Sequence, residues 1–102
     1  MSGSLNLLPA ILTASGTVTT DSTRIAGFTI TNKSATDGAG ITFYQLETDK
    51  TLGSEVFHVE LGSVGENGNQ ITQTYNGQTG IYFKNGVYAS VDTSCVGFIT
   101  YF

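Results

Sequence analysis

The sequence predicts an all-β protein, an antiparallel β-sandwich, and three observations carry this prediction. Asn-Gly pairs occur at residues 67–68, 76–77 and 85–86, nine residues apart, and Asn-Gly between alternating apolar segments is a strong hairpin signal. The 102 residues include 13 Gly and 16 Thr but a single Pro, a composition typical of short strands and tight turns. No window of about 11 residues has a helical period.

The chain is expected to form one domain, residues 10–102, preceded by an N-terminal arm of residues 1–9. The arm is small, polar or Leu in character and ends at Pro9. After it, residues 10–20 alternate weakly between apolar and polar side chains. At 24–31, Ala26, Phe28 and Ile30 should share one side of a strand, with Ile25 and Thr29 on the other. Further strands are expected at residues 41–46, 55–64, 69–75, 78–83, 87–91 and 95–102.

The Asn-Gly spacing also predicts a strand register. If each turn is a three-residue loop with its Gly left-handed in a bulge, the loops are 66–68, 75–77 and 84–86, and residues 55–91 form a C-terminal meander of hairpins. Phe83 then pairs with Val87. One face of the meander becomes apolar except for Gln73, which should lie near an edge or an interface. The apolar residues of this face are Phe57, Val59, Leu61, Ile71, Tyr75, Ile81, Phe83, Val87, Ala89 and Val91.

The same register sets four further pairs: Ile81 with Ala89, Ile71 with Ile81, Leu61 with Gln73, and Val59 with Tyr75. How the strands before residue 55 pair with the meander is left open by this pattern. A jelly-roll crossing and a simpler two-sheet sandwich both fit it.

The charge of the chain excludes some classes of partner. The formal net charge is −4, and Arg24, Lys33, Lys50 and Lys84 are the only cationic residues besides His58. Without a basic stripe, nucleic acid and anionic membranes are poor partners. Charged residues make up 12% of the chain, about half the usual share. A neutral polar surface of this kind suits a protein packed among neighbours.

The remaining signals point away from catalysis. His58 is the only histidine; it should point away from the core with Glu60 as a surface partner, and it cannot build a metal cluster alone. Glu47 and Asp49 lie in a loop that lacks the ligand count of a calcium site. Cys95 has no disulfide partner and is expected to be a buried apolar residue. We therefore expect no enzyme, no metal and no cofactor.

The last predicted strand is apolar on both sides, with Val96, Phe98 and Phe102 opposite Cys95, Ile99 and Tyr101. Such a strand must be covered on both faces, and a contact between subunits would do this. We expect no signal peptide and no membrane span, because the first residues lack a basic segment and no long apolar stretch occurs, so synthesis in a cytoplasm is expected. The residues chosen as subunit contacts are Leu5, Leu7, Leu8, Phe98, Tyr101 and Phe102.

The C-terminal third carries a resemblance to a known class of proteins. An aromatic residue, a spacer, Asn-Gly, an apolar residue and Tyr are followed by an alternating strand, in the residues Gly80-Ile81-Tyr82-Phe83-Lys84-Asn85-Gly86-Val87-Tyr88-Ala89-Ser90-Val91 and Gly97-Phe98-Ile99-Thr100-Tyr101. Over roughly residues 78–102 this pattern resembles small β-structured virion proteins of tailed bacteriophages.

The resemblance implies a structural subunit of the virion, made in the host cytoplasm, and carries over no functional residue. A capsid decoration (cement) protein that stabilises the phage head is the favoured interpretation, with a head–tail component also compatible. Its partners would be its own copies, with a homotrimer favoured, and the major capsid protein or other virion proteins. The alternative is a tail or fibre component that binds a glycan or receptor through Tyr and Asn side chains in loops.

Overall fold

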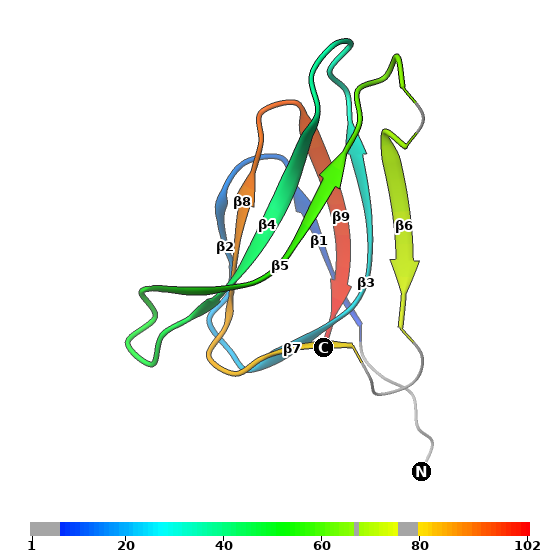
Figure 1. Ribbon diagram of the computed structural model, residues 1–102. Helices are drawn as coiled ribbons and strands as arrows, with labels where there is room; N and C mark the ends of the chain where they lie inside the picture. Colours follow the sequence, from blue (N-terminus) through cyan, green and yellow to red (C-terminus); the bar gives the residue numbers. More distant parts are fainter. Residues whose placement is uncertain (1–6, 67, 76–79) are drawn as a thin grey trace.

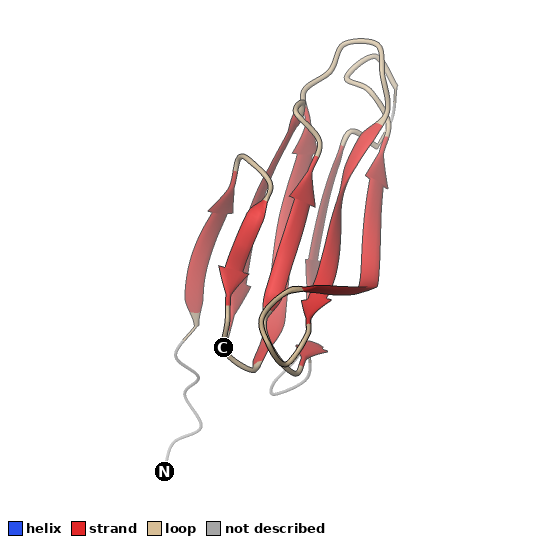
Figure 2. Cartoon of the chain, turned by 90° about the vertical axis from the view of Figure 1, so that its left-hand side faces the viewer, coloured by secondary structure: helices blue, strands red, loops and turns tan. Residues whose placement is uncertain are grey.

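The computed structural model describes residues 7–66, 68–75 and 80–102, which form two antiparallel sheets packed face to face (Figures 1 and 2). Sheet A contains β1 (Leu8–Leu12), β9 (Cys95–Tyr101), β3 (Thr23–Asn32) and β6 (Gln70–Thr74) in this order, with β7 (Ile81–Phe83) also paired to β3. Sheet B contains β2 (Gly16–Thr19), β8 (Val87–Val91), β4 (Ala39–Leu46) and β5 (Leu52–Leu61). No helix that could cross a membrane occurs among the described residues.

The connectivity is that of a jelly roll. From β1 to β4 each strand lies in the sheet opposite its predecessor, and the chain crosses again after β5, β7 and β8. Among the described strands, β4 and β5 alone are consecutive in the chain and directly hydrogen-bonded to each other. This order, β1-β9-β3-β6 against β2-β8-β4-β5, is the double Greek key of an eight-stranded jelly roll with β7 added. The prediction of an antiparallel sandwich is confirmed.

The predicted meander is wrong. Strands β6 and β7 both pair with β3, so that Ile71 lies opposite Ile30, Ile81 opposite Ile25 and Gln73 opposite Phe28. Strand β8 pairs with β2 and β4. Residues 84–86 therefore carry the chain from sheet A to sheet B instead of closing a hairpin. None of the five predicted pairs forms: Phe83 with Val87, Ile81 with Ala89, Ile71 with Ile81, Leu61 with Gln73, or Val59 with Tyr75.

The reason for this error is geometric. A chain that crosses to the facing sheet keeps its apolar side directed toward the same core, so the alternation of side chains is identical in both topologies. The glycine conformations were predicted correctly where they are described: Gly86 has φ +118° and Gly68 has φ +89°. Gly77 and the turn around it lie outside the described residues.

Most residues of the predicted apolar face do lie in the core or pack against it. Leu61, Phe83, Val87, Ala89 and Val91 are buried. Others of the set pack against the border of this core, namely Phe57, Val59, Tyr75 and Ile81. Ile71 stays 39% exposed because β6 is an edge strand, and Gln73 lies on the same edge as expected.

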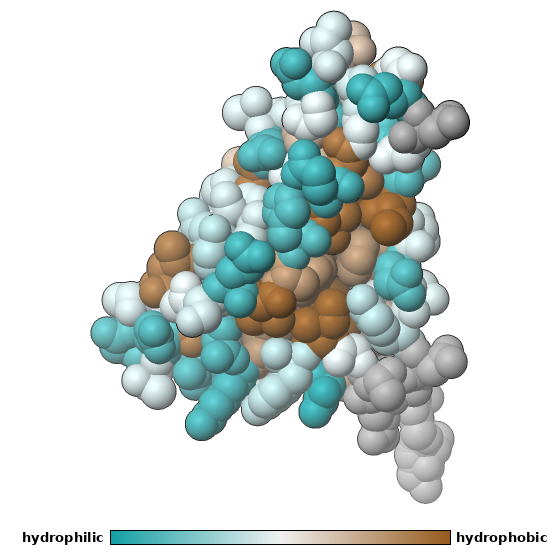
Figure 3. Space-filling view, viewed as in Figure 1, coloured by the Kyte–Doolittle hydropathy of each residue, from teal (hydrophilic) through white to brown (hydrophobic). Residues whose placement is uncertain are grey.

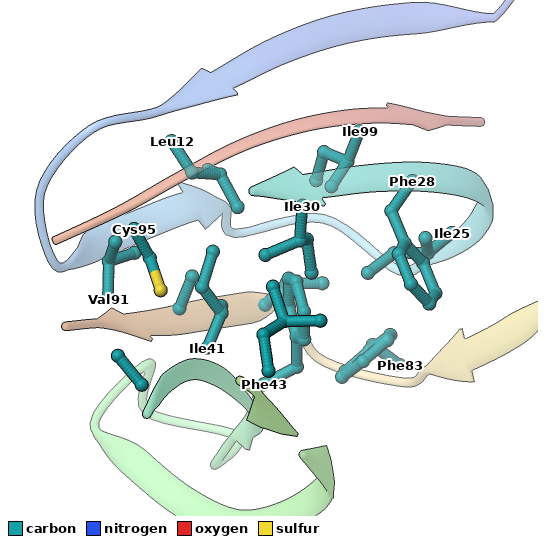
Figure 4. Close-up of a cluster of buried hydrophobic side chains, with 14 residues drawn as sticks. Leu12, Ile25, Phe28, Ile30, Ile41, Phe43, Phe83, Val91, Cys95 and Ile99 are labelled. Atoms are coloured by element: carbon teal, nitrogen blue, oxygen red, sulfur yellow. The ribbon is translucent and has the colours of Figure 1, made fainter. Parts of the chain in front are cut away.

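Aromatic rings join the two sheets. The ring of Phe57 in sheet B stacks on Phe43 with centroids 4.5 Å apart, and it lies 5.8 Å from Phe28 and 6.4 Å from Phe83 of sheet A. Figure 4 shows Phe28, Phe83 and Phe43 converging between the sheets. Stacked and tilted rings at these distances contribute about 0.5–1.5 kcal/mol per pair beyond their area burial.

A bulge alters the simple alternation expected for β3. The pairing of β3 with β9 shifts between Ile25 and Gly27, and both Ile25 and Ala26 are buried. Ile25 joins Phe28 and Ile30 in the core cluster, so the prediction that Ile25 lies on the opposite side of the strand from them was wrong, because a bulge places an extra residue on one strand. At the N-terminus, β1 begins at Leu8, so Leu8 and Pro9 belong to the sheet although both lie in the segment expected to be an arm.

One buried polar residue closes the end of the sandwich where three connections meet. The side-chain nitrogen Nδ2 of Asn32 donates to the backbone carbonyl oxygens of Asp37 and Gly62, both at 2.9 Å. Its oxygen accepts from the backbone N–H of Ser34 at 3.1 Å and from the Ser94 hydroxyl at 2.7 Å. Asn32 is fully buried, and these bonds tie the β3–β4, β5–β6 and β8–β9 connections together.

We predict that Asn32→Ala lowers the free energy of unfolding by about 2–4 kcal/mol, because it removes a fully buried amide that donates to two carbonyls and accepts from Ser34 and Ser94. This corresponds to a fall in melting temperature of roughly 10 °C or more for a domain of this size. Ser94→Ala removes one bond of the same network and should cost about 1 kcal/mol. Equal melting temperatures for Asn32→Ala and the parent protein would contradict the role assigned to this network.

We also predict that Gly86→Ala is far more costly than Gly68→Ala, although both glycines have positive φ. A Cβ at Gly86 would lie 2.5 Å from the Thr19 carbonyl oxygen and 2.9 Å from the Leu46 side chain, whereas one at Gly68 would have no atom within 4 Å. We expect losses of roughly 3 kcal/mol or more for Gly86→Ala and about 1 kcal/mol for Gly68→Ala. Thermal unfolding of both variants measures the difference, and equal losses would show that the crossing at Gly86 is not tightly packed.

Candidate interaction surface

The strand register places apolar and hydroxyl side chains in rows across the outside of sheet A. Ile11 of β1 lies opposite Phe98 of β9, Phe98 opposite Thr29 of β3, and Thr29 opposite Thr72 of β6. Directly opposed residues share one face of a sheet. Their buried neighbours in sequence, such as Phe28 and Ile99, point inward, so this row points outward.

Two neighbouring rows complete what we call the outer face of sheet A. One row joins Pro9, Thr100, Gly27 and Thr74, and the other joins Val96, Thr31 and Gln70. The side chain of Ile11 is 70% exposed and that of Phe98 is 45% exposed. None of the residues of this face is charged: Pro9, Ile11, Gly27, Thr29, Thr31, Gln70, Thr72, Thr74, Val96, Phe98 and Thr100.

The face has an apolar half and a hydroxyl-bearing half. The apolar half lies on β1 and β9. On β3 and β6 the hydroxyls of Thr29 and Thr72 are 3.0 Å apart, and the Gln70 amide donates to the Thr31 hydroxyl at 3.1 Å. A shallow hollow of about 140 Å³ lies between the two halves, lined by Gly27, Phe28, Thr29, Thr72, Thr74, Phe98 and Thr100.

Arg24 borders this face at the start of β3. Arg24 lies opposite Tyr82 of β7, and its guanidinium lies over the Tyr82 ring at 4.7 Å from the centroid. A cation held on an aromatic face is partly shielded from water. The border therefore combines a planar cation with an aromatic ring that is 49% exposed.

The structure distributes the predicted contact residues over two sides of the sandwich. Phe98 lies on the outer face of sheet A, whereas Tyr101 packs against the core. Leu7 and Leu8 are 47% and 51% exposed, Phe102 is half-buried, and Leu5 lies outside the described residues. Sequence reasoning missed Ile11, the most exposed large apolar residue described. Once residues 8–12 are known to form a strand, the i, i+2 spacing of Pro9 and Ile11 places both residues on the same face of the sheet.

The outside of sheet B is polar by comparison. His58 of β5 lies opposite Thr42 of β4, with its Nδ1 2.6 Å from the Thr42 hydroxyl and its Nε2 2.7 Å from a carboxylate oxygen of Glu60. The prediction that His58 points away from the core beside Glu60 is confirmed. Tyr44 and Tyr88 meet edge-to-face on the same side, with centroids 6.3 Å apart.

A second, polar hollow lies at the end of the sandwich near Asn32. It has a volume of about 500 Å³, is widely open, and is lined by residues of the β3–β4 and β8–β9 connections: Ser34, Asp37, Gly38, Ala39, Val91, Asp92, Thr93 and Ser94. One carboxylate oxygen of Asp92 accepts from the backbone N–H of Gly40 at 2.8 Å. Among residues 7–66, 68–75 and 80–102, no three His, Cys, Asp or Glu side chains are grouped to hold a metal ion.

Two further predicted positions have structural roles. Cys95 is buried, and burial raises the pKa of its thiol, with the nearby charges of Asp92 and Glu60 acting in the same direction. Asp49 accepts hydrogen bonds from the hydroxyl and the backbone N–H of Thr51, and these bonds lower the pKa of its carboxyl. Asp49 thus stabilises the β4–β5 turn, in which Lys50 has φ +70°.

Comparison with known proteins adds no relative: no family model, no curated protein and no solved structure matches this chain.

Proposed function

We propose that the protein is a structural subunit of a tailed-bacteriophage virion, and specifically a capsid decoration (cement) protein that stabilises the phage head through subunit contacts. The observation that carries this proposal is the uncharged outer face of sheet A, on which Ile11 and Phe98 are exposed side by side. Contiguous exposed apolar residues on a soluble domain mark an interaction site more often than isolated ones do.

The composition of this face suits burial against another protein. The centres of protein interfaces are depleted of charge, and the outer face of sheet A is uncharged and exposes the aromatic ring of Phe98. Each Å² of apolar surface removed from water there contributes about 25 cal/mol. The hydroxyls of Thr29, Thr31 and Thr72 are hydrogen-bonded within the sheet, so covering these three does not leave them without a partner.

Fold and composition support the same proposal. Jelly rolls are the domains of many viral capsid proteins, although lectins and cupins share them, so the fold alone does not decide function. The low share of charged residues, 12%, fits a protein that is packed among neighbours. The proposed partners are the major capsid protein and further copies of this chain.

The test compares apolar-to-lysine substitutions on the two sheets. Ile11→Lys and Phe98→Lys each place a charge within the proposed interface, so each should weaken binding to purified phage heads by tenfold or more. Val56→Lys, at a residue 40% exposed on β5 of sheet B, is the matched control and should bind normally. Co-sedimentation with heads measures binding, and thermal unfolding confirms that all three variants fold.

Two outcomes contradict the proposal. One is the absence of the protein from purified virions of the encoding phage by mass spectrometry. The other is normal head occupancy by both Ile11→Lys and Phe98→Lys.

A second candidate function is a glycan- or receptor-binding module of a tail or fibre. The polar hollow at the end of the sandwich favours it, because the carboxylates of Asp37 and Asp92 and the hydroxyls of Ser34 and Ser94 line one open depression. Such groups bind sugar hydroxyls. Binding of the isolated protein to a glycan array, unchanged by Ile11→Lys, would favour this function over capsid decoration.

A further inference from the structure

The edge strand β6 presents an unprotected backbone. Its five residues, Gln70 to Thr74, are all exposed, and among the described strands β6 pairs with β3 alone. The strand contains no charge and no proline. A free edge carries unpaired N–H and C=O groups and is a template for pairing with another chain.

The other three sheet edges each carry a feature that discourages pairing. Strand β1 has Pro9 within it, which removes a donor. Strand β5 carries Glu55, His58 and Glu60 and has irregular pairing. Strand β2 has four residues and a register shift between Thr17 and Thr19. Charges, prolines, bulges and short length are the usual protections of an edge, and β6 has none of the first three.

The hydrogen bonds of β6 define which of its groups are free. In an antiparallel pair, opposed residues alternate between pairs that exchange both backbone bonds and pairs that exchange none. The N–H of Asn32 donates to the Asn69 carbonyl and the N–H of Tyr75 to the Ala26 carbonyl, both at 2.8 Å. Residues 69, 71, 73 and 75 therefore bond toward β3. Residues 70, 72 and 74 direct their N–H and C=O groups outward.

We propose that β6 pairs antiparallel with β6 of a second copy of this chain. With Thr72 opposite Thr72 on a two-fold axis, Gln70 lies opposite Thr74 of the other copy, and each of these pairs exchanges both backbone bonds. Six hydrogen bonds form and every outward group of the strand is used. In the single chain, the side-chain amide of Gln73 donates to the Thr74 carbonyl at 3.3 Å. In the dimer, a backbone N–H of the other copy replaces this donor. Because the outward N–H and C=O groups of β6 are complementary to those of a second, antiparallel β6, we expect the partner to be another copy of this chain.

The side of the sandwich next to β6 supports this pairing. Strands β5 and β6 are the edges of the two sheets on the same side of the molecule (Figure 1). In Figure 3, apolar side chains gather between the positions of these strands. Phe57 and Val59 of β5 pack against the core on this flank yet keep exposed area, and Ile71 of β6 is 39% exposed. A second copy at β6 brings the same flank of both molecules together.

The pairing also changes the surface offered to a particle. Strands that pair within one sheet are related by an axis perpendicular to that sheet, so the outer faces of sheet A in both copies point the same way. This consequence rests on the proposed function: a dimer would engage the capsid with two adjoining copies of that face and gain avidity. The contact is two-fold and predicts a dimer, in contrast to the trimer favoured from the sequence.

The first test measures native mass, by light scattering and sedimentation of the full chain over a concentration series. The parent protein should dimerise. Thr72→Pro removes one outward N–H from each copy, and Thr72→Lys places two like charges opposite each other, so each should raise the dimer dissociation constant about tenfold or more. Thr17→Lys, at an exposed threonine on edge strand β2, adds the same charge elsewhere and should leave the dimer intact.

The second test measures the register by disulfide formation under mild oxidation. Thr72→Cys places two thiols opposite each other at the axis, within the separation that a disulfide spans, and should yield a covalent dimer. Gln70→Cys lies opposite Thr74 and should cross-link at least tenfold less, while the double variant Gln70→Cys, Thr74→Cys should cross-link again. The native Cys95 is buried and should not contribute.

Three results overturn the pairing: a parent protein that stays monomeric, a dimer unaffected by both Thr72→Pro and Thr72→Lys, or equal cross-linking by Thr72→Cys and Gln70→Cys. These readouts use no phage particle. Failure of the dimer thus leaves head binding to be judged separately, and loss of head binding by Ile11→Lys is measured without reference to β6.

Discussion

The contact between the two sheets is the constraint on which the rest of the structure depends. Phe57 stacks on Phe43 within sheet B and meets Phe28 and Phe83 of sheet A, so one ring ties both layers. Successive side chains of a strand point to opposite faces of the sheet. The choice of residues that face the core therefore also determines which residues of each strand face solvent. The exposure of Ile11 and Phe98 is a direct consequence of burying Leu12 and Ile99 beside them.

The jelly-roll connectivity imposes a second requirement, at the ends of the sandwich. Strands that change sheets need connections across its open end, and the backbone groups of those connections need partners. The Asn32 side chain bonds backbone groups of the β3–β4 and β5–β6 connections and accepts from the Ser94 hydroxyl of the β8–β9 connection. No buried side-chain nitrogen or oxygen among the described residues lacks a partner. Gly86 solves the corresponding problem at one crossing, where a side chain would collide with Thr19. Asn32 and Gly86 therefore stabilise the connections between strands and contribute little to the outer surfaces.

The two outer surfaces then differ in the chemistry available to a partner. Sheet B shows the exposed side chains of His58 and Glu60 and the half-buried rings of Tyr44 and Tyr88. Sheet A shows a neutral face that costs little to dehydrate, bordered by the neutral edge β6. An uncharged face and an unprotected edge in the same sheet fit the capsid decoration role proposed above, since such a protein works through contact area and repetition of copies. The open polar hollow near Asn32 belongs to the competing glycan-binding proposal.

The all-β class, the positive φ of Gly68 and Gly86, and most of the inward-facing residues from Phe57 to Val91 could be predicted from the order of residues alone. The same order also predicted that His58 and Glu60 share a surface, because these features depend on local backbone geometry and a period of two. The strand partners were decided only by tertiary structure. Backbone hydrogen bonds do not depend on the type of side chain, so they do not specify which strands pair. The alternation of inward-facing side chains is also the same for a hairpin and for a crossing between sheets. Ile81 therefore pairs with Ile25 and not with Ala89, and the free edge of β6 became visible only once the strand order was known.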